Sequence, residues 1–167
     1  KLRNMDRQEI FYSGVPDPRA ADGQRALYAE NPAAVWLGAN GRRFINETAD
    51  NRTLATTLSE MKPTSYWLLF DTRGSRRLNL RDISTQEGAI LRDEILADPA
   101  ITASARTLDQ LAIKAGLPAY SLRTTVETWN RMVELGEDYQ FGRFNKSNRT
   151  ATIGFISEPP YYALRVY

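Results

Sequence analysis

The stretch GANGRRFINETADNR, residues 38–52, decides the fold of this chain because it combines a turn, a strand edge and the start of a helix. Asn40-Gly41 is typical of a type I′ hairpin turn, since both central positions of that turn need a positive φ. The apolar run AVWL precedes the turn, and the alternating residues RFINE follow it. Both patterns are typical of strands, so we expect a β-hairpin over residues 34–47.

A helix should follow the hairpin directly. Asp50 or Asn51 can serve as its N-cap, because a side-chain oxygen at that position accepts hydrogen bonds from the free amides of the first turn. The corner between strand and helix then carries Glu47, Asp50 and Arg52, at a place where polar side chains can face a ligand. The apolar positions that continue the helix are Leu54, Leu58 and Met61.

The composition indicates one globular domain with a restricted set of chemical groups. The chain has 167 residues and 42% hydrophobic content, which is enough for a core of its own. It contains neither cysteine nor histidine, so it cannot carry a thiol nucleophile, a disulfide, a Ser-His-Asp triad or most kinds of zinc and iron site. Acid–base chemistry in this chain must therefore use carboxylates, tyrosine, lysine or arginine.

Arginine supplies 18 of the 22 basic residues, against 20 acidic residues and a net charge of +2. Arginine suits bidentate recognition of carboxylate or phosphate better than lysine does. A nucleic-acid interface would gather these residues into one stripe, whereas here they are scattered and only residues 73–81 are dense. We therefore expect no nucleic-acid partner, and we interpret the dense run as a solvated loop.

The sequence contains no stretch of about 20 apolar residues, so no membrane span is expected. The opening residues KLRNMDRQEI lack both an apolar signal region and an initiating methionine. We therefore expect the chain to be a piece of a longer protein.

Glycine and proline divide the rest of the chain into elements. Prolines interrupt the N-terminal part and leave a short strand at 10–12 and a short helix at 20–29. The continuous apolar run at 66–70 predicts a central strand that is buried on both faces. Another helix should run through residues 89–96 and stop before Pro99.

The second half of the chain is predominantly helical. Thr107 begins a capping box, and the helix over residues 108–115 should end at Gly116 in the αL conformation. A second helix over residues 119–135 should stop at Gly136. The connection between the two helices is short, so they should pack together on the sheet. The remaining predicted elements are a polar loop over residues 136–149 and an aromatic strand over residues 159–167.

Four of these stretches together resemble a known family. They are GRRFINE at 41–47, TLDQLAIKAGL at 107–117, LRTTVETWNRMVELGEDYQFGR at 122–143 and PPYYALRV at 159–166. In this order and spacing they are similar to the fumarate reductase, succinate dehydrogenase flavoprotein and 3-ketosteroid dehydrogenase type of FAD-dependent oxidoreductase, over about three quarters of the chain. The resemblance implies an α+β fold, with a small sheet, a β-hairpin and several packed helices. It also implies the role of the cap domain, which closes over the flavin and traps the substrate.

FAD is the cofactor that the resemblance implies, held by a separate FAD-binding domain that would be this chain's partner. No GxGxxG pattern follows a strand in this sequence, so no turn is available to hold the FAD pyrophosphate at a helix N-terminus. We therefore expect residues 1–167 to form a single cap domain that binds no FAD and has no activity by itself. Lys1 and Tyr167 should lie close together, as the ends of an inserted domain do.

The reaction implied by the resemblance is reduction or desaturation of a C=C bond beside a carbonyl or carboxylate, in a small unsaturated acid or an enone. In fumarate reductases the proton donor is an arginine shortly after the RFxNE motif, which makes Arg52 the candidate catalytic residue here. Glu47, Asp50 and Arg43 are candidates for substrate binding or proton relay. The other interpretation of Arg52 is a surface side chain at a helix N-terminus, where the helix dipole disfavours a cation.

Two departures from the family pattern point away from fumarate itself. Arg52 lies five residues after Glu47, where fumarate reductases usually have four. The Thr-Glu pair and the arginine that hold a dicarboxylate in that family correspond, by ungapped counting, to Ala26, Leu27 and Glu30. A larger enone, a steroid or an unsaturated monoacid therefore fits better. Two alternatives stay open, a 3-ketosteroid dehydrogenase-like desaturase and a non-enzymatic module that binds an anionic ligand.

Overall fold

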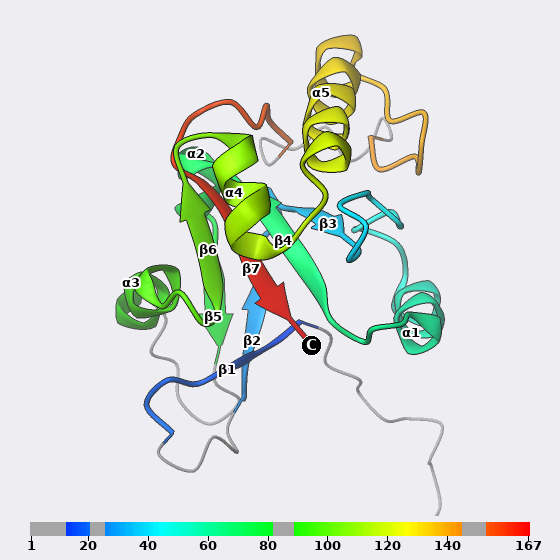
Figure 1. Cartoon of the computed structure of the whole chain (residues 1–167). Coiled ribbons are helices and arrows are strands. Elements are labelled where there is room, and N and C mark those ends of the chain that lie inside the picture. The colour runs from blue at the N-terminus through cyan, green and yellow to red at the C-terminus, as the bar shows by residue number, and fades with distance from the viewer. Residues whose placement is uncertain (1–12, 21–25, 82–88, 145–152) are drawn as a thin grey trace, which may run out of the picture.

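Two antiparallel sheets organise the computed structural model, which describes residues 13–20, 26–81, 89–144 and 153–167. The three-stranded sheet has the order β1-β2-β5, and the four-stranded sheet has the order β3-β4-β7-β6. Helices accompany both sheets (Figure 1), so the predicted α+β class is confirmed, with two sheets where one was expected. The strands are β1 (Gly14–Pro16), β2 (Ala26–Glu30), β3 (Val35–Leu37), β4 (Tyr66–Phe70), β5 (Asn79–Arg81), β6 (Thr102–Ala105) and β7 (Tyr161–Val166).

Strand β4 is the central strand that its apolar sequence predicts. It pairs with β3 on one side and with β7 on the other. Because side chains alternate along a strand, Leu68 and Phe70 enter the core that β4 shares with the three-stranded sheet, while Leu69 enters the core beneath two helices. The predicted burial of β4 on both faces is therefore confirmed, and the four-stranded sheet separates two hydrophobic cores.

The second core lies under α4 (Leu108–Ala115) and α5 (Ala119–Leu135). Trp129 and Leu122 of α5 are fully buried there, together with Leu111 of α4. Figure 1 shows α4 in front of β6 and β7, with α5 continuing above it. The predicted packing of the two helices on the sheet is confirmed. The remaining helices are α1 (Asn51–Glu60), α2 (Thr72–Ser75) and α3 (Ala89–Ala97), and α3 contributes Leu91 and Ile95 to the first core.

The ends of the helices follow the capping signals in the sequence. Asp50 is the N-cap of α1, and Thr107 is the N-cap of α4 with its hydroxyl accepting from the Gln110 amide at 3.2 Å. Gly116 and Gly136 end α4 and α5 in the left-handed region, at φ values of 67° and 69°. These boundaries confirm the predicted helices, as α3 confirms the helix that stops before Pro99.

The hairpin turn differs from the predicted type I′ geometry. Only Gly41 of the Asn40-Gly41 pair has a positive φ, 72°, and its amide donates to the Gly38 carbonyl at 2.9 Å. Beyond the turn the two arms meet only at the Leu37–Arg43 bridge, so the predicted second strand is reduced to one residue. This arrangement matches a three-residue hairpin loop that ends in a left-handed glycine.

A tertiary contact explains why the turn takes this shape. A Cβ on Gly41 would lie 3.3 Å from the Cβ of Ser121 and 3.4 Å from the Leu122 nitrogen. The Thr125 hydroxyl donates to the Gly41 carbonyl at 2.9 Å. The turn is therefore seated on the first turns of α5, which draws the following residues away from a regular ladder.

Other predictions fail where pairing between distant segments overrides local preference. The helix expected at 20–29 is wrong, because residues 26–30 form β2 between β1 and β5, with alternating burial. The loop expected at 73–81 is wrong as well, since α2 and β5 occupy most of it. Strand β6 was not predicted. The strand expected at 10–12 lies outside the described residues.

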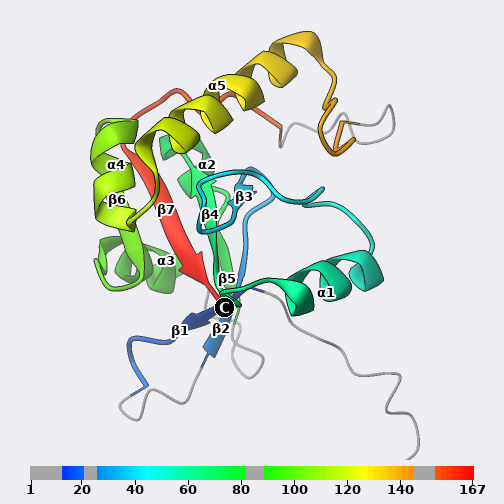
Figure 2. The ribbon, with the colours of Figure 1, turned by 45° about the vertical axis from the view of Figure 1, so that its right-hand side comes forward.

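Gly14, near the first described residue, pairs through its backbone with Tyr167, the last residue. The Gly14 amide donates to the Tyr167 carbonyl at 3.0 Å, and the Tyr167 amide donates to the Gly14 carbonyl at 3.0 Å. The predicted closeness of Lys1 to Tyr167 lies outside the described residues. Figure 2 shows α1 to one side of the sheets, joined to β3 by the segment that contains the hairpin turn. Among the described residues, no helix has the length and apolar character needed to cross a membrane.

Candidate functional site

A buried cluster of charged side chains lies at the base of the predicted corner. The Arg43 guanidinium donates to both oxygens of Glu47, from Nε to Oε1 at 2.9 Å and from Nη2 to Oε2 at 2.8 Å. Nη2 also donates to Oδ2 of Asp138 at 2.9 Å. The three side chains are 1%, 3% and 0% exposed, respectively. Paired guanidinium–carboxylate bonds of this kind are strong and fix the geometry of both groups.

Arg143 completes the cluster from the loop after α5. Its Nη1 lies 3.2 Å from Oε2 of Glu47 and donates to the Ala34 carbonyl at 2.8 Å. Its Nη2 donates to the Pro32 carbonyl at 2.5 Å. Two guanidinium groups therefore face two carboxylates, and the formal charges of the cluster cancel.

Aromatic rings enclose this cluster. The Cζ atoms of Arg43 and Arg143 lie 5.0 and 5.2 Å from the centre of the Trp129 ring, and the Cζ of Arg43 lies 5.0 Å from the centre of the Phe141 ring. Aromatic faces attract cations at these distances. The aromatic rings therefore give the guanidinium groups favourable neighbours where water is excluded.

The pKa values in the cluster follow from burial and from the partners. Burial alone lowers the pKa of Arg43, but the hydrogen bonds and charges of Glu47 and Asp138 outweigh it and raise that pKa above its usual range. Burial alone raises the pKa of Asp138, and the Arg43 bond and nearby amides outweigh it, so the pKa is lowered. For Arg143 burial dominates and lowers the pKa.

The exposed part of the corner between the hairpin and α1 is held by hydrogen bonds to the side chains of Asn46 and Asp50. Asn46 Oδ1 accepts from the amide and the hydroxyl of Thr48, at 2.9 and 2.8 Å. Asp50 Oδ1 accepts from the amides of Arg52 and Thr53, at 3.0 and 3.1 Å, and its Oδ2 accepts from the Thr53 hydroxyl at 2.7 Å. The hydrogen bonds that Asp50 accepts lower its pKa, and the bond from the Thr53 hydroxyl has the largest effect.

The structure places the four predicted site residues in two separate environments. Arg43 and Glu47 are together in the buried cluster, whereas Asp50 and Arg52 are exposed at the start of α1. Glu47 also accepts from the Trp36 amide at 3.1 Å. Its carboxylate is thus directed toward the hairpin and not toward α1.

Asp138 and Arg143 were not predicted as functional residues. They lie in the segment that was expected to be a polar loop. Counted as whole residues, however, Asp138 and Arg143 are only 5% and 2% exposed. Their signal was their position within the stretch LRTTVETWNRMVELGEDYQFGR, which is part of the resemblance. The sequence alone did not show that a loop carboxylate meets Arg43 across 95 residues.

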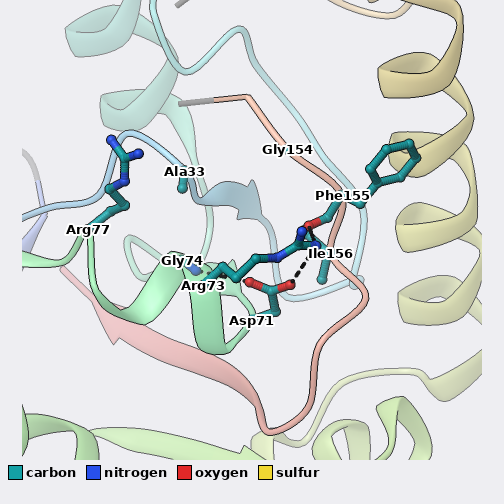
Figure 3. A pocket seen from close by; sticks show the side chains of 8 residues that line it. All are labelled: Ala33, Asp71, Arg73, Gly74, Arg77, Gly154, Phe155 and Ile156. Atoms are coloured by element: carbon teal, nitrogen blue, oxygen red, sulfur yellow. Dashed lines mark hydrogen bonds and ion pairs between the residues drawn. The ribbon is translucent and has the colours of Figure 1, made fainter. Parts of the chain in front are cut away.

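A pocket of about 200 Å³ lies elsewhere, between α2 and the segment before β7 (Figure 3). The Asp71 carboxylate occupies its interior, accepting from the Gly74 amide at 2.9 Å and from the amides of Ser157 and Glu158 at 3.1 Å each. Arg73, which also lines the pocket, pairs with Glu158 at 3.3 Å. The Asp71 carboxylate and the Arg73 guanidinium of this pocket thus already have partners within the protein.

These residues do not fit an FAD pyrophosphate. A dinucleotide needs free backbone amides at a helix N-terminus after a glycine-rich turn. The described strand-to-helix turn at Asp71 instead holds a carboxylate on those amides, and the start of α1 does the same with Asp50. Gly74 serves packing, since a Cβ there would lie 2.7 Å from the Cβ of Phe70. No cluster of three or more potential metal-ligating carboxylates occurs in the described residues.

Comparison with known proteins identifies the class of this α+β domain. The family model described as "FAD binding domain" matches residues 14–167. A 3-oxosteroid 1-dehydrogenase of Mycobacterium tuberculosis is 29% identical over 97% of this chain and 32% of that protein. The crystal structure of a 3-ketosteroid delta1-dehydrogenase from Sterolibacterium denitrificans, in complex with 1,4-androstadiene-3,17-dione, matches 93% of this chain and 31% of that one, with a TM-score of 0.67 and 21% identity.

A shorter solved chain is also similar. The solution NMR structure of a fumarate reductase flavoprotein subunit from Lactobacillus plantarum matches 80% of this chain and 81% of that one, with a TM-score of 0.56 and 17% identity. Because the family model covers almost all of the sequence, the chain belongs to the FAD-binding family of flavoprotein oxidoreductases, and FAD is the cofactor of that family. The chain spans about a third of the length of the steroid dehydrogenase that it matches.

Proposed function

We propose that this chain is the cap domain of an FAD-dependent oxidoreductase that reduces or desaturates a C=C bond beside a carbonyl or carboxylate. The observation that carries this proposal is a family match along the whole domain combined with helix N-termini already filled by Asp50 and Asp71. Such a domain needs FAD to be held by another part of the protein, its own FAD-binding domain.

Arg52 is the residue of this chain that we assign to proton transfer at the substrate carbon. Its support is its exposure in the first turn of α1, apart from the buried cluster. Asp50 lies two positions earlier and, as a carboxylate, can exchange the proton with Arg52. A guanidinium is a weak acid in water, but it can serve when a dry site holds it against a developing negative charge. For Glu47 and Arg43, the predicted role in substrate binding or proton relay stays a prediction.

An enone, a steroid or an unsaturated monoacid is the substrate class that we favour over a dicarboxylate. Ala26, Leu27 and Glu30 all lie on β2, where Leu27 is buried in the core and Glu30 approaches Arg81 at 3.5 Å. These side chains offer no pair of cationic groups for two carboxylates. The relatedness to a 3-oxosteroid 1-dehydrogenase supports the same substrate class.

The proposal is tested by replacing Arg52 with glutamine in the full-length protein. We expect Arg52→Gln to lower substrate turnover by about 100-fold or more, the usual loss when a proton-transferring side chain is removed. FAD content and thermal midpoint should stay near the wild-type values, because exposed substitutions usually change stability by less than about 0.5 kcal/mol. Arg52→Lys should restore turnover only in part, since an ammonium lacks the planar guanidinium geometry.

Arg42→Gln is the matched control for this experiment. Arg42 is also exposed and lies on the hairpin, ten positions before Arg52. The control should keep wild-type turnover on a panel of enones and unsaturated acids. Wild-type turnover in Arg52→Gln would remove Arg52 from the reaction, and absence of FAD from the full-length protein would contradict the oxidoreductase assignment itself.

A further inference from the structure

We propose that Asp138 and Glu47 are positioning residues that hold the start of α1, and with it Arg52, in a fixed place. The inference rests on the proposed function only where it concerns activity. Its structural basis is a chain of contacts that runs from the loop after α5, through the buried cluster, to the first turn of α1.

The first link is the loop that follows α5. Asp138 Oδ1 accepts from the amides of Gln140 and Phe141, at 3.0 and 3.1 Å, and Oδ2 accepts from the Arg143 amide at 3.1 Å. The same Oδ2 accepts from Arg43 Nη2 at 2.9 Å. One carboxylate therefore shapes its own loop and joins it to the hairpin.

The second link is Glu47. Oε1 of Glu47 accepts from Arg43 Nε and from the Trp36 amide, and Oε2 accepts from Arg43 Nη2 and lies 3.2 Å from Arg143 Nη1. Three separate segments thus hold the two oxygens: Trp36 of β3, Arg43 beyond the hairpin turn, and Arg143 of the loop after α5. This leaves the Glu47 side chain with one orientation.

The third link is the short path from Glu47 to the helix. The Ala49 amide donates to the Asn46 carbonyl at 3.0 Å, and the Asn46 side chain holds Thr48. Asp50 then caps α1 through the amides of Arg52 and Thr53. Hydrogen bonds hold the turn over residues 46–49, and the Asp50 cap follows it directly, so a displaced Glu47 should displace or loosen the first turn of α1.

The energetics of the cluster favour a positioning role over a purely stabilising one. Apolar residues of similar volume often replace buried ion pairs without loss of stability, so such pairs are weak evidence for stability. Within the described part of the chain, Nη1 of Arg43 and Nε of Arg143 are buried without a hydrogen-bond partner. A cluster that leaves two donors unpaired is poorly optimised for stability, whereas it defines relative positions well.

The test uses hydrogen exchange in the full-length protein, comparing Asp138→Asn with the control Asp109→Asn. Asp109 pairs with Arg123 on the surface and is 58% exposed. We expect Asp138→Asn to raise amide exchange in residues 48–54 about tenfold or more relative to the control, with β4 and β7 unchanged. Substrate kcat should fall about tenfold while KM stays within about threefold. Arg43→Lys, which keeps the charge but not the paired geometry, should give the same pattern if Asp138→Asn does not fold.

The outcomes separate this inference from the proposed function. Faster exchange at 48–54 together with lower kcat supports both. Faster exchange with unchanged kcat supports the positioning of α1 and contradicts the role of Arg52 in turnover. Unchanged exchange at 48–54 in a folded variant overturns the inference, whatever the activity, as does a uniform increase across β4 and β7.

Discussion

Four charged residues from two distant segments form a buried cluster of ion pairs. Arg43, Glu47, Asp138 and Arg143 are almost completely buried, and each of the four contacts at least one of the others. Burying charges costs free energy unless partners replace the lost water. Here carboxylates, backbone carbonyls and the Trp129 ring supply those partners.

The acid stability of the chain should depend on Asp138. Its pKa is lower in the folded state than the ordinary value of 3.8, so the unfolded state binds more protons between the two values. The stabilisation is therefore complete above the ordinary value and is lost as the pH falls through the folded-state pKa. Urea unfolding from pH 6 down to about 2 should show a loss of unfolding free energy that is smaller in Asp138→Asn.

The surface carboxylate Asp109 provides the comparison for this prediction. Asp109→Asn removes one carboxylate without touching the cluster. Both variants lose one carboxylate, so the comparison separates the effect of the buried cluster from the loss of a surface carboxylate. An unchanged slope in Asp138→Asn would mean that the pKa of Asp138 is not lowered by folding.

The hairpin turn packs on α5, and this contact between two elements could not be predicted from the local sequence. A Cβ on Gly41 would meet Ser121 and Leu122 at close range, and the Gly41 carbonyl accepts from the Thr125 hydroxyl. The same contact places Arg43 near Trp129, one helical turn further along α5. The contact that holds the turn on α5 therefore also positions the charge cluster.

A pair of glycine substitutions isolates this contact. Gly41→Ala and Gly116→Ala both place a side chain at a similar positive φ, 72° and 67°, which costs about 1–2 kcal/mol in each case. A Cβ on Gly116 meets nothing within 4 Å, whereas a Cβ on Gly41 meets α5 at 3.3 Å. Urea unfolding should therefore show a larger loss for Gly41→Ala. Equal losses would indicate that the turn is not tightly seated on α5.

Separation of two hydrophobic cores by one sheet characterises the whole molecule. In the described part of the chain, β4 and β7 contribute apolar side chains to both cores. The NMR structure of a fumarate reductase flavoprotein subunit is similar in fold over 81% of its own chain.

We expect the purified 167-residue chain to unfold cooperatively and to be colourless. Its described part has two hydrophobic cores, while the N-termini of α1, α2 and α4 hold a carboxylate or a hydroxyl in place of phosphate. Absorbance at roughly 450 nm, where bound flavin absorbs, should be absent after purification and after incubation with FAD and desalting. Stoichiometric yellow flavin on this chain would contradict the cap-domain proposal. The full-length protein, purified in parallel, should be yellow.

The local sequence determined the elements whose signals are contained within a few neighbouring residues. The Thr107 and Asp50 caps and the glycines that end α4 and α5 specify hydrogen bonds to residues only a few positions away. The continuous apolar run of β4 specifies a strand that is buried on both faces. The motifs also pointed to the flavoprotein family, and the family model agrees. Glu47 was selected for its place at the corner between strand and helix, and Arg43 as the competing arginine on the hairpin, although their burial was not foreseen.

Tertiary structure alone decided which partners the polar residues meet. The sequence placed Asp138 and Arg143 in a loop, and only the docking of α5 on the sheet brings them to Arg43 and Glu47. It likewise gave residues 26–29 helical preference, which pairing with β1 and β5 overrode. The physical reason is the same in both cases. Local preferences amount to tenths of a kcal/mol per residue, whereas burial of a strand or a charge is decided by contacts with residues far along the chain.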